Sequence, residues 1–264
     1  MNWRPYLRVL LASARENSAN PKQIITAICV SLFRVFLLAA IYEVAYRFGK
    51  AGLSYENAIW SLAVHFAFII NLGIRDLFKA VEQDVQSGGV ELQLIKPLDW
   101  RLTKICQAIG KNCIEFTLQL LILPVFLLFV VGRPDTSFWS PVFLLGFVLL
   151  TMFAVISACC LFMCVGLTAF WLNDAKSVFR MVDKTILVFG GAFVPIALLP
   201  HVVQTIVRYS PFGVYAAPTQ IFNPAVTSFL IGYLLSAIFW TTSLILLNNL
   251  MWRRVQSRIE VNGG

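Results

Sequence analysis

Long uninterrupted apolar runs constrain this chain more than any other feature of its sequence. A helix needs about 20 mostly apolar residues in a row to cross the hydrocarbon core of a bilayer. Six runs reach or nearly reach that length, at residues 24–46, 58–78, 105–131, 138–170, 185–200 and 226–250. Only 13% of the residues are charged, whereas soluble domains average about 25%. The sequence therefore predicts an all-α polytopic membrane protein with six transmembrane helices.

The N-terminal segment 1–22 predicts an amphipathic helix rather than a signal peptide. It contains several basic residues but neither a continuous apolar centre nor a cleavage site. The apolar side chains of this segment share one helical face, which consists of Trp3, Leu7, Leu10, Leu11 and Ala14. Such a helix is suited to the membrane interface. We therefore expect a cytoplasmic interfacial helix at 1–22, with an ordinary cytosolic tail as the alternative, followed by one six-span domain at 23–264.

The distribution of basic residues predicts the orientation. Cytoplasmic loops of membrane proteins carry an excess of Lys and Arg. With the N-terminus inside, sixteen of the 21 basic residues fall in cytoplasmic segments and four fall outside, while Arg34 lies within a span. We therefore expect both termini in the cytoplasm. Anionic membrane lipids are a sufficient counterpart for the net charge of +8, so we expect no nucleic-acid partner.

A polar island at about 75–104 separates the second and third apolar runs. It combines acidic and basic residues with apolar residues at helical spacing, interrupted by two adjacent glycines. A connection that only reached through solvent would need no ordered apolar residues. We interpret the island as a docking element for a soluble partner. The residues expected to make that contact are Val85, Gly88, Gly89, Leu92, Leu94, Lys96 and Pro97.

The fifth apolar run is unusually short and contains helix-breaking residues. It supplies about 16 residues before the proline that ends it, or roughly 24 Å of helix. Irregular backbone at membrane depth must be covered by protein or line a cavity. We therefore expect a span that ends early, with re-entrant extracellular helices at about 193–223 that close the outer end. A plain span with an extracellular loop is the alternative. The gate residues expected here are Gly190, Gly191, Pro195, Pro200 and Pro211.

Four polar residues within the apolar runs are candidate pathway residues, because ionisable groups inside a membrane are costly and often functional. They are Arg34, His65, Glu115 and Gln119. Arg34 and Glu115 each lie eleven residues beyond the cytoplasmic start of their runs, so the sequence predicts an ion pair between them. A structural pair and a substrate or gating contact are both open. The weaker candidate His65 fits either a polar lining or a hydrogen bond between helices.

The sequence contains no motif for nucleotide binding or hydrolysis. It lacks the phosphate-binding G-x-x-x-x-G-K-[ST] pattern, and its six Cys and two His residues do not have metal-site spacing. We therefore expect a transport subunit that is not an enzyme and holds no metal or cofactor.

Two sequence stretches resemble the ABC type-2 exporter permeases. The first, QSGGVELQLIKPLDW, is similar to the family pattern after the second span, and the second, GGAFVPIALLPHVVQTIVRYSPF, is similar to the pattern around the fifth. The order of elements matches that family across nearly the whole chain.

This resemblance implies a permease subunit in a bacterial plasma (inner) membrane, with ATP and Mg bound by partner ABC ATPase subunits. It also implies a second permease chain, identical or different, and a coupling helix within Val81–Pro97. The cargo would be amphipathic and lipid-like or drug-like. The alternative is an ion-coupled secondary transporter or channel subunit without an ATPase, with a relay through Arg34, Glu115 and His65.

Overall fold

The computed structural model describes residues 3–48, 53–67, 74–95, 97–135, 140–172, 174–223 and 226–262. Throughout these ranges the regular secondary structure consists of α-helices, short 3-10 helices and a π-helical turn at 66–67, without a strand. The predicted all-α class is therefore confirmed.

Four described helices are long and apolar enough to cross a membrane. They are contained in α2 (Pro21–Phe48), α6 (Trp100–Val130), α7 (Pro141–Leu167) with its 3-10 extension η2 (Thr168–Phe170), and α11 (Val226–Asn262). Even α7 alone, at 1.5 Å per residue, is about 40 Å long. These helices correspond to the first, third, fourth and sixth apolar runs of the sequence.

The second apolar run is divided between two helices. α3 comprises Tyr55–His65, and α4 comprises Ile74–Gln86. Ser54 caps the start of α3 by accepting a hydrogen bond from the backbone nitrogen of Asn57 at 3.2 Å. Residues 68–73, in the middle of this run, lie outside the described residues. A crossing at 58–78 therefore stays a prediction.

The fifth apolar run is also not one helix. α8 comprises Ala175–Phe189 and begins ten residues before the predicted start of the run. Its 15 residues amount to about 22 Å, which is shorter than a hydrocarbon core of about 30 Å. The helix stops at Gly190, and Gly191 follows with a φ of 85°. The predicted early end is therefore present, although the boundaries of the helix are shifted towards the N-terminus.

Four short elements follow α8 before the last long helix. They are η3 (Ile196–Leu198), α9 (His201–Tyr209), α10 (Gly213–Ala216) and η4 (Ala217–Phe222). Every residue of α10 and η4 is buried. α9 is more open, with Val207 as its buried residue. The segment is therefore a compact cap, packed on the neighbouring helices, rather than an extended loop.

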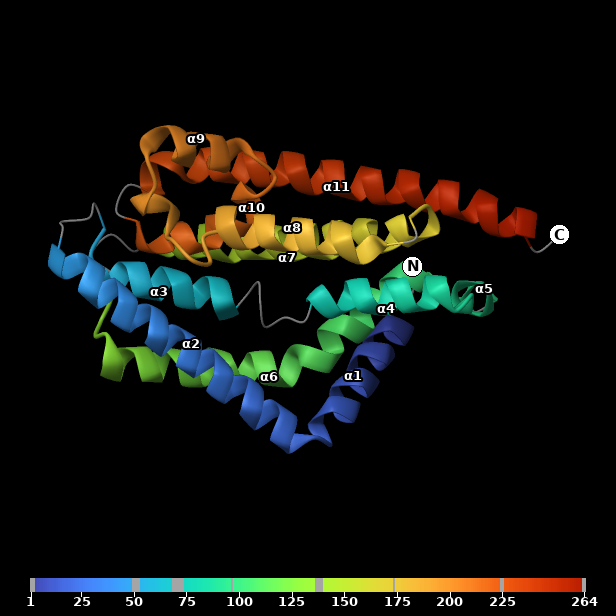
Figure 1. Ribbon diagram of the computed structural model, residues 1–264, viewed down its shortest axis with the longest axis horizontal. Coiled ribbons are helices and arrows are strands. Elements are labelled where there is room, and N and C mark those ends of the chain that lie inside the picture. The colour runs from blue at the N-terminus through green and yellow to red at the C-terminus, as the bar shows by residue number, and fades with distance from the viewer. Residues whose placement is uncertain are drawn as a thin grey trace.

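The helices form two packed groups that meet along α6 (Figure 1). The larger apolar core is built from α4, α7, α8, α10 and α11 together with the first part of α6, and the smaller core joins α2 and α3 to the second half of α6. α7 and α11 form the most extensive contact in the larger group. Because α6 contributes to both cores, it connects the two groups mechanically.

The amphipathic helix α1 (Arg4–Ser18) packs against the first half of α6. A Cβ on Gly110 would lie only 2.3 Å from the backbone oxygen of Leu10, so this contact requires a glycine. Trp3, Leu7 and Leu11 remain exposed. These exposed apolar side chains suit the interfacial location predicted for 1–22.

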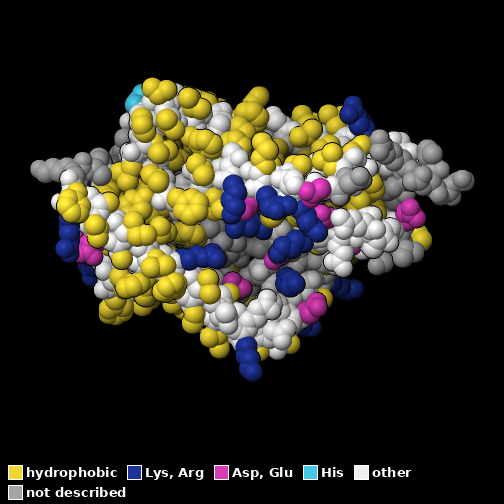
Figure 2. All heavy atoms as spheres, in the orientation of Figure 1, with side chains coloured by type: hydrophobic (Ala, Val, Ile, Leu, Met, Phe, Trp, Pro, Cys, Tyr) yellow, Lys and Arg dark blue, Asp and Glu magenta, His cyan; other side chains and the backbone are white. Residues whose placement is uncertain are grey.

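The two ends of the bundle contain different elements and different kinds of side chain. α5 (Gly89–Leu94) and the chain termini lie in the right half of Figure 1, whereas α9 and the end of α2 lie at the left. We call these the α5 end and the α9 end. Figure 2 shows apolar side chains over much of the α9 end, with Lys and Arg gathered over the middle of the same face, between α8 and α6.

The packing of α4 on α7 predicts a steric effect at Gly166. A Cβ on this glycine would lie 2.5 Å from Cγ1 of the fully buried Val81. We expect Gly166→Ala to lower the stability of the detergent-solubilised chain by about 1–3 kcal/mol through overpacking. Adding Val81→Ala should recover part of this loss by making room. Thermal unfolding of both single variants and the double variant measures the coupling.

Gly232→Ala is the matched control for this prediction, because its new Cβ would meet only the Tyr209 hydroxyl, at 3.9 Å. If the stability losses of Gly166→Ala and Val81→Ala simply add in the double variant, the proposed steric clash is wrong.

Candidate functional site

The predicted docking element bends where the two glycines lie. α4 ends at Gln86, and α5 begins at Gly89. Between them Gly88 has a φ of 69°, a left-handed conformation that costs a residue with a side chain about 1–2 kcal/mol. No heavy atom would lie within 4 Å of a Cβ at this position. Gly88 is therefore required for the backbone turn and not for close packing.

Among the described side chains of α5 and its C-terminal cap, one apolar residue is buried and another protrudes. Val90 is buried in the larger core, and Val85 of α4 packs partly buried against the same core. By contrast, Ile95 at the end of α5 is 82% exposed. An apolar side chain held out at a helix end is a candidate contact for a partner protein.

Some of the remaining predicted docking residues lie outside the described part of the structure. The backbones of Leu92 and Leu94 belong to α5, but their side chains lie outside the described residues, as does all of Lys96. Pro97 is described and is exposed. Contact of these residues with a partner stays a prediction.

A carboxylate on α4 holds α5 in place. Oδ2 of Asp84 accepts hydrogen bonds from Nε1 of Trp100 at 2.8 Å and from Nε2 of Gln93 at 3.2 Å. The same oxygen lies 2.7 Å from Nζ of Lys104, whose side chain is only 9% exposed. One carboxylate thus joins α4, α5 and the first turn of α6, and we call these four residues the Asp84 junction.

The Asp84 junction continues into α11 through stacked indole rings. Trp100 stacks on Trp252 with ring centroids 5.2 Å apart. The Arg101 guanidinium lies 5.4 Å from the Trp252 ring centroid and donates hydrogen bonds to the side-chain oxygens of Asn248 and Asn249, each at 2.8 Å. α5 is therefore linked to the last long helix as well as to α4 and α6.

α4 also contacts α8, the short helix of the fifth run. Phe78 stacks on Phe179 with centroids 4.4 Å apart. Near the start of α4, Nε of Arg75 lies 2.6 Å from Oδ1 of Asp183, and both side chains are largely buried. The start of α8 is capped by Asp174, and the hydrogen bond from the Ser177 hydroxyl lowers the pKa of this carboxyl group.

The predicted ion pair between Arg34 and Glu115 is wrong. Arg34 is exposed on α2, and its side chain pairs with no acidic group in the described residues. Glu115 is half-buried and accepts a hydrogen bond from Gln119 at 3.1 Å on its own helix. Equal depth along two helices does not ensure that two side chains face each other. Arg75 of α4 and Asp183 of α8 form an ion pair between two helices instead.

His65 lies beside the predicted gate. It is fully buried at the end of α3, and a Cβ on Gly190 would lie 3.0 Å from its Cε1. One turn earlier, the Ser61 hydroxyl donates to the backbone oxygen of Thr219 in η4 at 2.9 Å. The structure therefore brings α3 against both the end of α8 and the buried part of the cap.

The residues predicted to form a gate lie at the turns of the cap, and their gating role stays a prediction. Gly190 and Gly191 form the turn after α8, Pro195 precedes η3, and Pro200 precedes α9. Pro211 lies between α9 and α10. Tyr42 of α2 donates a hydrogen bond to the backbone oxygen of Phe193 at 2.7 Å. Phe193 lies between α8 and η3, so this bond attaches the segment that leads into the cap to the smaller helix group.

No pattern in the sequence identifies the residues that hold α5. Asp84, Trp100, Lys104 and Arg101 all lie in or beside the polar island, but a charged loop offers no periodic signal that distinguishes paired residues from solvated ones. Asp183 was likewise not distinguished from its basic neighbours.

The described residues include no group of three or more His, Cys, Asp or Glu side chains that could hold a metal ion. Residues 27–263 match a family model described as ABC-2 family transporter protein. No curated protein matches the chain.

The Asp84 junction predicts a large loss of stability when its buried Asp84–Lys104 ion pair is broken. We expect Asp84→Ala to lower stability by about 3–5 kcal/mol, because Lys104 would remain buried without its partner. Adding Lys104→Met should reverse much of that loss. Chemical unfolding in detergent would measure the stability, and limited proteolysis of α5 would report whether the helix is released.

The exposed pair Lys79–Asp76 on α4 is the control, with side chains 69% and 43% exposed. Asp76→Ala should cost at most about 1 kcal/mol. An equal effect at Asp76 and Asp84 would show that the junction does not hold α5.

Proposed function

Because the chain belongs to the ABC-2 transporter family, we propose that it is the transmembrane permease subunit of an ATP-driven exporter. The observation that carries this proposal is the placement of α5. A short helix with the 82%-exposed Ile95 is anchored by the Asp84 junction, at the end of the bundle where both chain termini lie (Figure 1). Such a helix can contact an ATPase while its other contacts transmit movement to the long helices.

The energy source must lie in a partner under this proposal. The sequence lacks the glycine-rich motif that would cradle nucleotide phosphates. ABC ATPase subunits would bind ATP and Mg and would contact α5. A second permease chain would complete the pathway, and the outward-moving cargo would be amphipathic, either lipid-like or drug-like.

We assign the α5 end to the cytoplasm and the α9 end to the outside. The basic residues of the sequence favour this orientation. The four long apolar helices supply four crossings, and α3 with α4, and α8 with the cap, supply the second and fifth. The protein would then be a six-span permease of the bacterial plasma membrane, with both termini in the cytoplasm.

The cap of η3, α9, α10 and η4 would close the outer end of the pathway. Support comes from its contact with α3, through Ser61, and from the hydrogen bond of Tyr42 in α2 to Phe193, in the segment that leads into the cap. Both contacts join this region to the smaller helix group. A separation of the two groups at this end would break these hydrogen bonds, so the cap is well placed to open when the ATPases close.

The docking proposal predicts that Ile95→Glu uncouples the permease. A carboxylate at this protruding position would oppose burial against an ATPase groove. The variant should insert normally, whereas copurification of the ATPase and transport-stimulated ATP hydrolysis should fall to background. Copurification and ATPase assays on the reconstituted complex provide the measurement.

Leu172→Glu is the control for Ile95, since Leu172 is an exposed apolar residue beyond the end of α7. It should leave coupling intact. If Ile95→Glu retains full copurification and stimulation, α5 is not the docking helix.

The orientation predicts which sites an impermeant thiol reagent can reach. In a cysteine-free background, His201→Cys on the exposed start of α9 should react only from outside. Ser177→Cys on the exposed first turn of α8 should react only from the cytoplasm. Mass spectrometry of intact cells and inverted vesicles separates the two cases. Labelling of His201→Cys from the cytoplasm would overturn the assigned orientation.

A further inference from the structure

An apolar groove follows α7 on the side that faces α6. It consists of two adjoining hollows of about 460 Å³ and 390 Å³, and Val155 and Ile156 line both of them. The larger hollow lies nearer to the α5 end, between α6, α7 and α11, and the smaller one extends towards the start of α7. Because they share these two residues, the hollows form one elongated groove.

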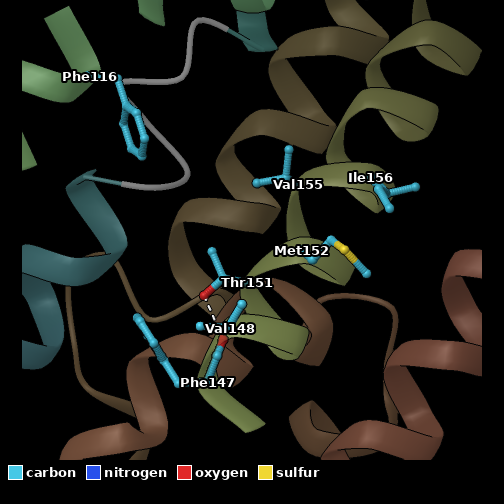
Figure 3. Close-up of a pocket in the computed structure, with 7 residues that line it drawn as sticks. All are labelled: Phe116, Phe147, Val148, Thr151, Met152, Val155 and Ile156. Carbon is cyan, nitrogen blue, oxygen red and sulfur yellow. Dashed lines mark hydrogen bonds between the residues drawn. The ribbon is translucent and has the colours of Figure 1, made fainter. Parts of the chain in front are cut away.

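The walls of the smaller hollow are suited to a hydrocarbon chain. Figure 3 shows Phe116 of α6 beside the row of α7 side chains that includes Phe147, Met152 and Val155. Thr151 is the polar residue in this wall, and its hydroxyl donates to the backbone oxygen of Phe147 at 2.8 Å. The Thr151 hydroxyl thus donates its hydrogen within the helix. A ligand in this hollow would therefore meet mainly apolar side chains.

The polar residues of the groove gather at its other end. Arg101, Asp99, Asn248 and Asn249 line the larger hollow where α6 begins. The Arg101 guanidinium is held there by both asparagines and by Asp99, whose Oδ2 lies 3.2 Å from its Nη2. Both Nη1 hydrogens are donated to the asparagines and one Nη2 hydrogen to Asp99, so one Nη2 hydrogen remains for a phosphate. Asn249 is exposed beside it.

The length of the groove matches one leaflet of a bilayer. From Arg101 to Phe116 α6 rises about 22 Å, at 1.5 Å per residue. One leaflet contributes about 15 Å of hydrocarbon, half of a core of about 30 Å, and the headgroup layer lies beyond it. The groove therefore extends from headgroup level to the middle of the membrane when α6 spans it.

We propose that this groove binds one glycerophospholipid from the leaflet at the α5 end. The phosphate contacts Arg101 and Asn249, and an acyl chain lies along α7 past Ile156 as far as Phe116. Polar side chains, Arg101 among them, gather at one end of an otherwise apolar groove, and this arrangement favours a lipid with a phosphate headgroup over a second copy of the chain. This site goes beyond the proposed transport function and requires neither an ATPase nor a cargo.

Native mass spectrometry of the full chain, released from detergent micelles, tests the site. The probes are a diacyl phosphatidylglycerol and a diacylglycerol with the same chains. The wild-type chain should retain one phosphatidylglycerol and no diacylglycerol. Ile156→Trp should weaken retention of the lipid at least about tenfold, because the indole would occupy the space of the acyl chain in the groove. Leu145→Trp, at a 60%-exposed position of α7 outside the groove, should retain the lipid.

Three outcomes would overturn the proposal. Equal retention by Ile156→Trp and the wild-type chain would place the lipid elsewhere. If the chain retains diacylglycerol as well as it retains phosphatidylglycerol, the phosphate does not contribute to binding. A dimer that binds no lipid and dissociates in Ile156→Trp would make a second copy the occupant. Copurification of the ATPase with Ile156→Trp, measured in parallel, separates failure of this site from failure of the transport assignment.

Discussion

Oδ2 of Asp84 accepts hydrogen bonds from Trp100 and Gln93 and pairs with the ammonium of Lys104, and each of these partners holds a different part of the α5 end. α5 has only six residues, too few for an isolated helix to be stable in water. Its position therefore depends on tertiary contacts. With the carboxylate in place, the Trp100–Trp252 stack extends the same connection to α11, so a force on α5 would act on α4, α6 and α11 together.

α8 offers a physical connection between the two ends of the molecule. In its first turns it contacts α4 through the Phe78–Phe179 stack, and at its middle through the Arg75–Asp183 pair near the start of α4. At the α9 end it stops at Gly190, against the fully buried His65. A helix of 15 residues between these contacts is short enough to move as one rigid element. In the proposed exporter, displacement of α4 by an ATPase would reach the cap through α8.

Several features followed from the sequence because they depend on local pattern. Long apolar runs require helices in a membrane, since each backbone polar group must be satisfied within its own segment. The bend at Gly88 and the early end of the fifth run at Gly190 follow from glycine chemistry at those positions. The division of the second run between α3 and α4 did not follow, because apolar composition alone does not separate one helix from two.

The sequence by itself determined the helical class, the positions of the four longest helices and the site of the turn before α5. Only the tertiary structure decided which polar groups meet. Arg34 and Glu115 lie at similar depths yet do not pair, whereas Arg75 and Asp183, 108 positions apart, lie within 2.6 Å. The reason is geometric. Sequence spacing fixes the height of a side chain along its own helix, but its direction towards a neighbour depends on how the helices rotate and pack.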